Sequence, residues 1–431
     1  MISACGGGSG SAARYGGCSE DGAKATDESG VALLCSQNSA GELMWDVDSS
    51  AGSTSAGGAL ALKDVFSREC NQDGPKKYST GFGDPEKFSH IVPLGAMIST
   101  HITPVDHIYV YFPAGTEGSA PGTFTVTSPA DGAVVSVEDF QMTNDYPYPD
   151  YRIVVEHSCD LYSVFIHVGQ LQGKLAEAAS GAKTNGGSWS GRIEVAAGDV
   201  LADESANPGY DFSTFATAAK QSMINPASYF QTESWKPYTA NPFDFVDAQL
   251  KSAYEAKTLR VSDPVGGTIF HDKEGTAQGS WFVKGTNGYM GLGDQKASYN
   301  NHGKVARGYW DTHLALAPEH VDATAFIYSI GDWEGCPCQF MSVGNVNPTS
   351  IETSSTPTVV DLVEYEIVNS DGSRMDPRTP TRGYKLKPGS KVAGSLALQV
   401  NEDGSMTVEK RPNEKASTFS GFTDKAATYV R

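Results

Sequence analysis

The chain of 431 residues is too long for one typical domain, and its length favours two or three domains. The formal net charge of −19 disfavours a nucleic-acid partner and electrostatic attachment to anionic lipid, because those surfaces are themselves negative. Plentiful Gly, Tyr and Phe, with few stretches suited to long amphipathic helices, indicate a mainly β protein. No apolar run reaches the roughly 18 residues of a membrane-spanning helix, so we expect any membrane link to be covalent or through a partner.

Near the N-terminus, Ile2-Ser3-Ala4-Cys5 follows an apolar, small, small, Cys pattern, and a Gly-rich tether comes next. The pattern resembles the lipobox of bacterial lipoproteins, which implies that an acylated Cys5 holds the chain at a membrane. The alternative is a chance cysteine in a Gly-rich leader. Residues 1–60, rich in Gly, Ser and Ala, predict a flexible stalk that has room for a small disulfide-pinned element.

Six cysteines remain if Cys5 is acylated, and an even number in a secreted chain suggests disulfides. We expect Cys18 to pair with Cys35 and Cys70 to pair with Cys159.

The third pair, Cys336-Pro337-Cys338, is spaced too closely for an unstrained bridge. Three alternatives stay open: two buried or bridged cysteines in a loop, a strained bridge, or a pair of soft-metal ligands. Two cysteines alone do not make a zinc site.

Residues 85–220 predict an antiparallel sheet domain, because short β-branched or aromatic runs alternate there with Gly, Pro, Asp and Asn. One helix is expected inside it, at 173–182. The first strand is expected within 88–94, and the clearest later strands are 108–112, 124–127, 133–137, 151–156 and 161–168.

Residues 221–254 predict a connector that is punctuated by proline, and a short helix is expected at 250–257. Residues 255–431 predict a second β domain, a C-terminal β-barrel or β-sandwich, from evenly spaced strands with turn residues between them. Its expected strands are 266–270, 280–283, 313–316, 325–329, 359–368, 395–400 and 406–409. Two roles are expected for Trp281, Trp310 and Trp333: they either belong to the core or line a ligand groove. The core is the commoner role for aromatic residues in sheets.

Histidines are concentrated in the first domain, where five of the nine lie between His90 and His167. Imidazole is the commonest metal ligand in proteins and the usual acid-base group near neutral pH. The sheet domain is therefore where a reactive site is expected.

Several segments of this domain follow one another in the order seen in a known family. They are Pro93-Leu94-Gly95 leading to His101-Ile-Thr-Pro-Val-Asp106, then VTSPADGAVV at 126–135, YSVFIHV at 162–168 and VAAGDVL at 195–201. Together they resemble the lysostaphin-type, or LytM-type, zinc endopeptidases, which cut peptide crosslinks in bacterial cell walls. The resemblance implies a duplicated hybrid-motif β domain, with His101 and Asp106 as zinc ligands and His167 as the acid-base or oxyanion group.

Two departures from that family concern the metal site itself. His101 and Asp106 are separated by four residues where the family has three. The family's His-x-His is Gly209-Tyr210-Asp211 here, so Asp211 is the expected third zinc ligand and Gly209 removes one imidazole.

Other interpretations of these histidines stay open. His90 and His157 are expected to be structural, His107 to be packed or a surrogate ligand, and His167 to be either a core residue or catalytic. The segments around His167 are also similar to the glucose-specific phosphocarrier of the sugar phosphotransferase system. That similarity supports the fold, whereas phosphotransfer does not suit an exported lipoprotein.

The sequence therefore predicts a protein of the bacterial cell envelope, lipid-anchored or secreted, whose partner is peptidoglycan or another envelope component. It is either a zinc-dependent peptidoglycan endopeptidase or an inactive binding or scaffold protein that uses the same fold. A groove with three convergent ligands would favour the enzyme, and a cavity plugged by Tyr210 would favour the binder.

Overall fold

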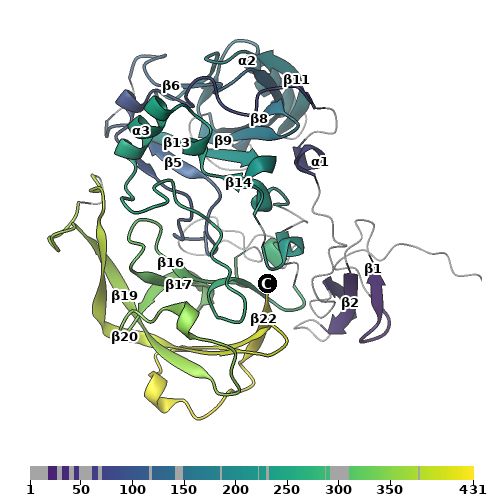
Figure 1. Cartoon of the computed structure of the whole chain (residues 1–431), viewed down its shortest axis with the longest axis vertical. Helices are drawn as coiled ribbons and strands as arrows, with labels where there is room; N and C mark the ends of the chain where they lie inside the picture. Colours follow the sequence, from purple (N-terminus) through teal and green to yellow (C-terminus); the bar gives the residue numbers. More distant parts are fainter. Residues whose placement is uncertain are drawn as a thin grey trace, which may run out of the picture.

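The computed structural model describes residues 18–26, 32–37, 43–47, 61–66, 70–115, 119–140, 149–184, 187–221, 223–229, 233–286, 288–291, 310–376 and 379–431. The expected fold class is confirmed: the chain is mainly β, with an antiparallel sheet domain followed by a β-barrel (Figure 1). Cys5 and most of the expected stalk lie outside the described residues. Within the described part of the chain, no helix is long and apolar enough to cross a membrane.

A small antiparallel sheet precedes the first domain, made of β1 (Lys24–Thr26), β2 (Ala32–Gln37) and β3 (Leu43–Val47). The disulfide Cys18–Cys35 pins it, and the second disulfide joins Cys70 to Cys159, so both expected pairings are confirmed. Leu33 is fully buried in this sheet and packs with Ala227.

The first domain is built on one large antiparallel sheet with the strand order β11-β7-β8-β9-β13-β5-β4, to which β14 adds beside β13. A smaller sheet, β10-β12-β6, and the expected helix, α2 (Leu175–Thr184), complete the domain. The strands are β4 (His90–Val92), β5 (Ile108–Tyr111), β6 (Thr125–Thr127), β7 (Gly132–Asp139), β8 (Tyr151–Ser158), β9 (Leu161–Val168), β10 (Gln170–Leu171), β11 (Ser188–Val195), β12 (Val200–Asp203), β13 (Gly209–Ala216) and β14 (Thr239–Ala240).

The central strands β8, β9 and β13 of the large sheet bury side chains on both faces, and the side chains alternate between these faces along each strand. Phe165 and Phe212 meet on the inner face, with ring centroids 4.8 Å apart in the main core cluster. On the opposite face, Phe215 packs with Phe66 of α1 (Leu62–Phe66) and with Trp235 of the connector. The connector therefore crosses the second face of the sheet.

The C-terminal domain is a closed barrel in which β15 to β22 pair in sequence order and β22 returns to β15. Trp281 and Trp333 lie in the interior cluster and Trp310 is buried, which agrees with the core role. The connector helix is α3 (Ala248–Lys257), and the barrel strands are β15 (Gly279–Val283), β16 (His313–Pro318), β17 (Phe326–Trp333), β18 (Cys336–Ser342), β19 (Thr358–Val368), β20 (Lys385–Val400), β21 (Met406–Pro412) and β22 (Ala427–Val430).

The strand expected at 266–270 is wrong, since this segment makes only an isolated bridge between Leu94 and Gly267. Gly267 has a φ of +77°, and a Cβ there would lie 2.2 Å from the carbonyl oxygen of Leu94. The segment is a close crossing between the two domains, which needs glycine and cannot continue as a regular strand.

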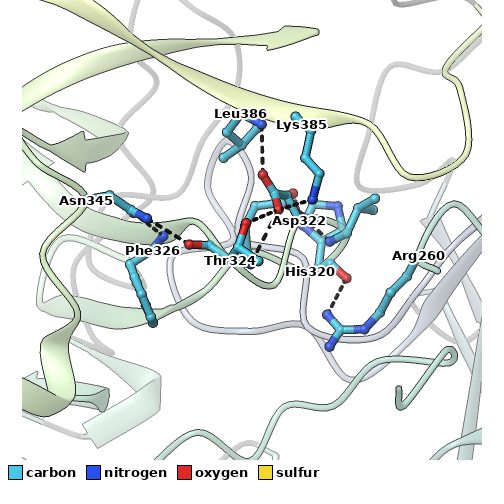
Figure 2. Close-up of polar contacts among 10 residues, drawn as sticks. Arg260, His320, Asp322, Thr324, Phe326, Asn345, Lys385 and Leu386 are labelled. Atoms are coloured by element: carbon cyan, nitrogen blue, oxygen red, sulfur yellow. Dashed lines mark hydrogen bonds and ion pairs between the residues drawn. The ribbon is translucent and has the colours of Figure 1, made fainter. Parts of the chain in front are cut away.

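The chain after α3 is held against the barrel by polar contacts that Figure 2 shows. Arg260 donates from Nη1 to the carbonyl oxygen of His320 at 2.9 Å. Asp322, in the same loop between β16 and β17, contacts Lys385 at 2.8 Å and accepts from the backbone of Leu386 at 3.1 Å. These contacts hold together the chain after α3, the loop between β16 and β17, and strand β20.

The Cys70–Cys159 disulfide closes a long loop, since the two residues are 89 apart in sequence. Replacing both cysteines by alanine is expected to lower the free energy of unfolding by about 3 to 5 kcal/mol, because an open loop gives the unfolded chain more entropy. Denaturant unfolding followed by tryptophan fluorescence measures this. The Cys18→Ala/Cys35→Ala variant is the control, because its loop of 17 residues is shorter and its opening adds less entropy to the unfolded chain; an equal or larger loss in the control variant would contradict the prediction.

Candidate functional site

The residues expected at the reactive site gather on the second face of the large sheet. Asp211 lies near the start of β13, paired on one side with Tyr109 of β5 and on the other with Ile166 of β9. The end of β9 presents His167, and the loop before β5 presents His101 and Asp106. The topology therefore brings all four expected site residues to one region.

His107 connects the members of this cluster. Its Nδ1 lies 3.3 Å from Oδ1 of Asp106, and its Nε2 lies 3.5 Å from Oδ2 of Asp211. The ring of His101 meets the ring of His107 edge-on, with centroids 6.0 Å apart. Of the two open interpretations of His107, the structure shows a buried imidazole placed between two carboxylates.

His167 forms the open end of the cluster. Its Nδ1 lies 3.1 Å from both carboxylate oxygens of the buried Asp150, and its Nε2 lies 4.0 Å from Oδ2 of Asp211. The side chain is 48 % exposed, whereas those of Asp106, His107 and Asp211 are nearly covered. His167 also has a φ of +61°, a backbone conformation that is uncommon and costs energy for a residue with a Cβ.

Residues of the connector cover the end of the cluster that lies opposite the exposed His167. Their part in the site was not predicted from the sequence. Trp235 donates from Nε1 to Oδ2 of Asp106 at 2.7 Å. The Nζ of Lys236 lies 3.6 Å from the same oxygen, 3.0 Å from Oε2 of Glu233 and 4.8 Å from the ring centroid of Tyr289. Lys236 is only 2 % exposed, so its ammonium group is a buried cation between two carboxylates and an aromatic face.

The charges of the buried residues determine their pKa values. Burial alone would raise the pKa of Asp106, but the Lys236 ammonium and the His107 imidazole outweigh it and hold this pKa well below its usual range. Burial opposes a charge on His107, yet Asp211 and Asp106 raise its pKa. Burial also raises the pKa of Asp211 itself, which His107 and His167 only partly offset.

The two remaining imidazoles shift in opposite directions. Burial, together with the charges of His107 and Lys236, lowers the pKa of His101 to about 4, so His101 is neutral near pH 7. Burial opposes the charged form of His167, but its hydrogen bond to Asp150 and the charge of Asp211 raise its pKa. Within the cluster, a proton is therefore favoured on His107 and on the exposed His167, and is disfavoured on His101.

This arrangement does not fit the expected zinc set of His101, Asp106 and Asp211. The oxygens of Asp106 already face Trp235, Lys236 and His107, and Lys236 adds a positive charge where a cation would bind. Among the described residues, no group of three or more His, Cys, Asp or Glu side chains is arranged to hold a metal ion.

The segment Gly209-Tyr210-Asp211 gives neither of the two expected arrangements, which were a groove with three convergent ligands and a cavity plugged by Tyr210. A Cβ on Gly209 would lie 2.0 Å from the carbonyl oxygen of Val110, so the backbone leaves no space for an imidazole there. Tyr210 points into the main core, where its hydroxyl donates to the carbonyl oxygen of Phe82 at 2.8 Å. The connector, and not Tyr210, fills the site.

The other two histidines of the domain have structural contacts. His90 stacks on Tyr111 with centroids 4.7 Å apart, and the buried His157 contacts the Ser163 hydroxyl at 2.6 Å.

Comparison of the chain with protein-family models, curated proteins and solved structures finds no match.

Replacing Lys236 by Met is expected to lower the free energy of unfolding by about 3 to 5 kcal/mol, because Asp106 loses its buried counter-charge. Combining it with Asp106→Asn should recover part of this loss, with a coupling energy of about 1 to 3 kcal/mol. Urea unfolding of both single variants and the double variant measures the coupling. Lys251→Met, which removes an exposed pair with Asp244, should change stability by less than about 1 kcal/mol; additive effects at Lys236 and Asp106 would contradict the buried pairing.

Asp150→Asn is expected to lower the pKa of His167 toward its usual value, because the carboxylate that stabilises the charged imidazole is lost. Because the pKa of His167 is raised in the folded state, its protonation contributes to the free energy of unfolding. This contribution is complete below the unfolded pKa of about 6.5 and is lost as the pH rises through the folded pKa. Titration of the imidazole signals by NMR measures the shift. Asp160→Asn, in an exposed pair with Lys76, is the control; the same His167 pKa in both variants would refute the assignment.

Proposed function

We propose that the chain is a noncatalytic binding protein of the bacterial cell envelope, anchored through an acylated Cys5 or secreted. Its sheet domain, which resembles that of the LytM-type endopeptidases, recognises a peptide of the cell wall or another envelope component. The position of Lys236 is the single observation that carries the noncatalytic part of this proposal. Its buried ammonium lies beside Asp106, the carboxylate that the resemblance assigns to zinc.

A ligand would meet the cluster at His167, its most exposed member. The Nε2 of His167 lies 4.0 Å from Asp211, beyond hydrogen-bond distance, so it is positioned to donate outward. The raised pKa of His167 favours the charged imidazolium, which suits a carboxylate of a wall peptide. The phenyl ring of Phe140, with its centroid 5.8 Å from that of His167, adds an apolar surface beside the imidazole.

A zinc-dependent peptidoglycan endopeptidase is the second candidate, and one observation favours it. The Nε2 of His107 is buried without a hydrogen-bond partner and lies 3.5 Å from a carboxylate oxygen of Asp211. An orphaned imidazole nitrogen beside a carboxylate is a donor pair of the kind that zinc uses. Enzyme and binder are therefore distinguished by bound metal and turnover.

Protein purified without chelator is expected to hold no stoichiometric zinc, to leave crosslinked wall peptides intact and to sediment with insoluble peptidoglycan. His167→Ala should weaken this binding by about tenfold or more, since a charge-assisted hydrogen bond contributes roughly 1.5 to 3 kcal/mol. His90→Ala is the matched control, because it removes an imidazole of the same domain outside the cluster. Metal analysis, a hydrolysis assay and co-sedimentation are the measurements.

The outcomes separate the candidates. Stoichiometric zinc with turnover of crosslinked peptide would replace the binder by the endopeptidase. Equal co-sedimentation of the wild type and both variants would remove His167 from the binding site. Failure to bind any cell-envelope fraction would reject the proposal.

A further inference from the structure

A pair of thiols lies at one end of the barrel, far in sequence from the polar cluster. β17 and β18 form a hairpin whose two turn residues, Glu334 and Gly335, both have positive φ, +54° and +88°. This is the backbone of a tight two-residue hairpin turn. Cys336 is the first residue after it and pairs with Trp333. Cys336 and Cys338 are thus at the start of a barrel strand, and both are partly exposed.

Pro337 separates the two cysteines without breaking the strand. The pairing steps from Trp333–Cys336 to Ile330–Cys338, so two residues of β17 lie opposite Pro337 alone. Such a bulge tolerates a residue that lacks an N–H donor. Because side chains alternate along a strand, both thiols point to the same side. That side is the barrel interior, since Cys338 packs against the interior cluster.

The spacing of the thiols suits a bridging ion better than a covalent bond. Residues two apart on a strand are separated by about 6.6 Å, and their Cβ atoms are nearly parallel. A disulfide needs Cβ atoms about 3.5 to 4.5 Å apart, so it would require the backbone to move. Two metal–sulfur bonds of about 2.3 Å need sulfurs about 4.6 Å apart, which two side chains reach by leaning together.

The surroundings agree with a dithiol that stays reduced. Both cysteines are free, whereas the pairs Cys18–Cys35 and Cys70–Cys159 are bonded. Among the described residues, no third His, Cys, Asp or Glu completes a group for zinc, which takes four ligands.

We propose that Cys336 and Cys338 form a two-sulfur binding site for a soft monovalent cation, of which Cu(I) is the biological example. Thiolates select Cu(I) over harder ions, and two ligands suffice for a linear site. Binding exchanges ions without oxidation: two thiols and one monovalent ion give a bis-thiolate complex and two released protons. This site is independent of the polar cluster on the large sheet.

The test uses the full-length protein and Ag(I), a redox-stable monovalent probe, in competition with a soluble thiol. Native mass spectrometry counts the ions bound to the wild type, Cys336→Ser, Cys338→Ser and the double variant. The wild type should bind one more ion than the double variant. Each single variant should bind that ion at least about 100-fold more weakly, since the chelate is lost. Cys5 is present in every protein and cancels in the comparison.

Pro337→Ala is the matched control, because it keeps both thiols on one side of the strand, and its affinity should equal that of the wild type. Unfolding midpoints verify that the serine variants are folded, and a repeat with Cu(I) under ascorbate should give the same ranking. Equal affinity in the wild type and the single variants would overturn the proposal. So would a Cys336–Cys338 disulfide found by peptide mapping of freshly purified protein.

Discussion

The buried ammonium group of Lys236 constrains how the sheet domain, the connector and the segment beside the barrel fit together. It lies 3.6 Å from Asp106 of the sheet domain, 3.0 Å from Glu233 of the connector and 4.8 Å from the ring of Tyr289 beside the barrel. Removing a charge from water costs several kcal/mol, and only well-placed partners repay that cost. Because the partners come from three parts of the chain, the charge is satisfied only when all three are in place.

This constraint also determines what the polar cluster can do. Its members alternate in charge from Glu233 through Lys236, Asp106, His107 and Asp211 to His167, so each group faces a partner inside the protein. A metal-dependent hydrolase needs an open position at which water and substrate meet. Here the connector covers the inner end and only His167 remains half exposed. Such a cluster is suited to holding one imidazole rigidly at a surface.

The sequence predicted the local elements better than the site, for a physical reason. Strands such as 161–168 are short runs of β-branched and aromatic residues, and the local pattern is enough to find them. β13 and β18 were not among the expected strands, because Gly209 and Pro337 are unfavourable in strands and are tolerated only through a close approach and a bulge. The expected site residues do come together, since alternation and strand pairing determine their positions. Lys236 is 130 residues from Asp106, and nothing in its neighbours Trp235 and Pro237 indicates that it folds over the sheet.

Two of the segments on which the resemblance rests have a structural role in this sheet domain. The turn around Asp131 and the turn around Asp199 bind each other directly. The backbone N–H of Ser128 donates to the carbonyl oxygen of Asp199 at 2.9 Å. The backbone N–H of Gly198 donates to the carbonyl oxygen of Ser128 at 2.8 Å. The Asp131 carboxylate accepts from the backbone of Ala197 at 2.8 Å. These residues hold two turns together and take no part in the polar cluster. These turns therefore contribute to the stability of the sheet, whereas the polar cluster around the buried Lys236 is built from other residues.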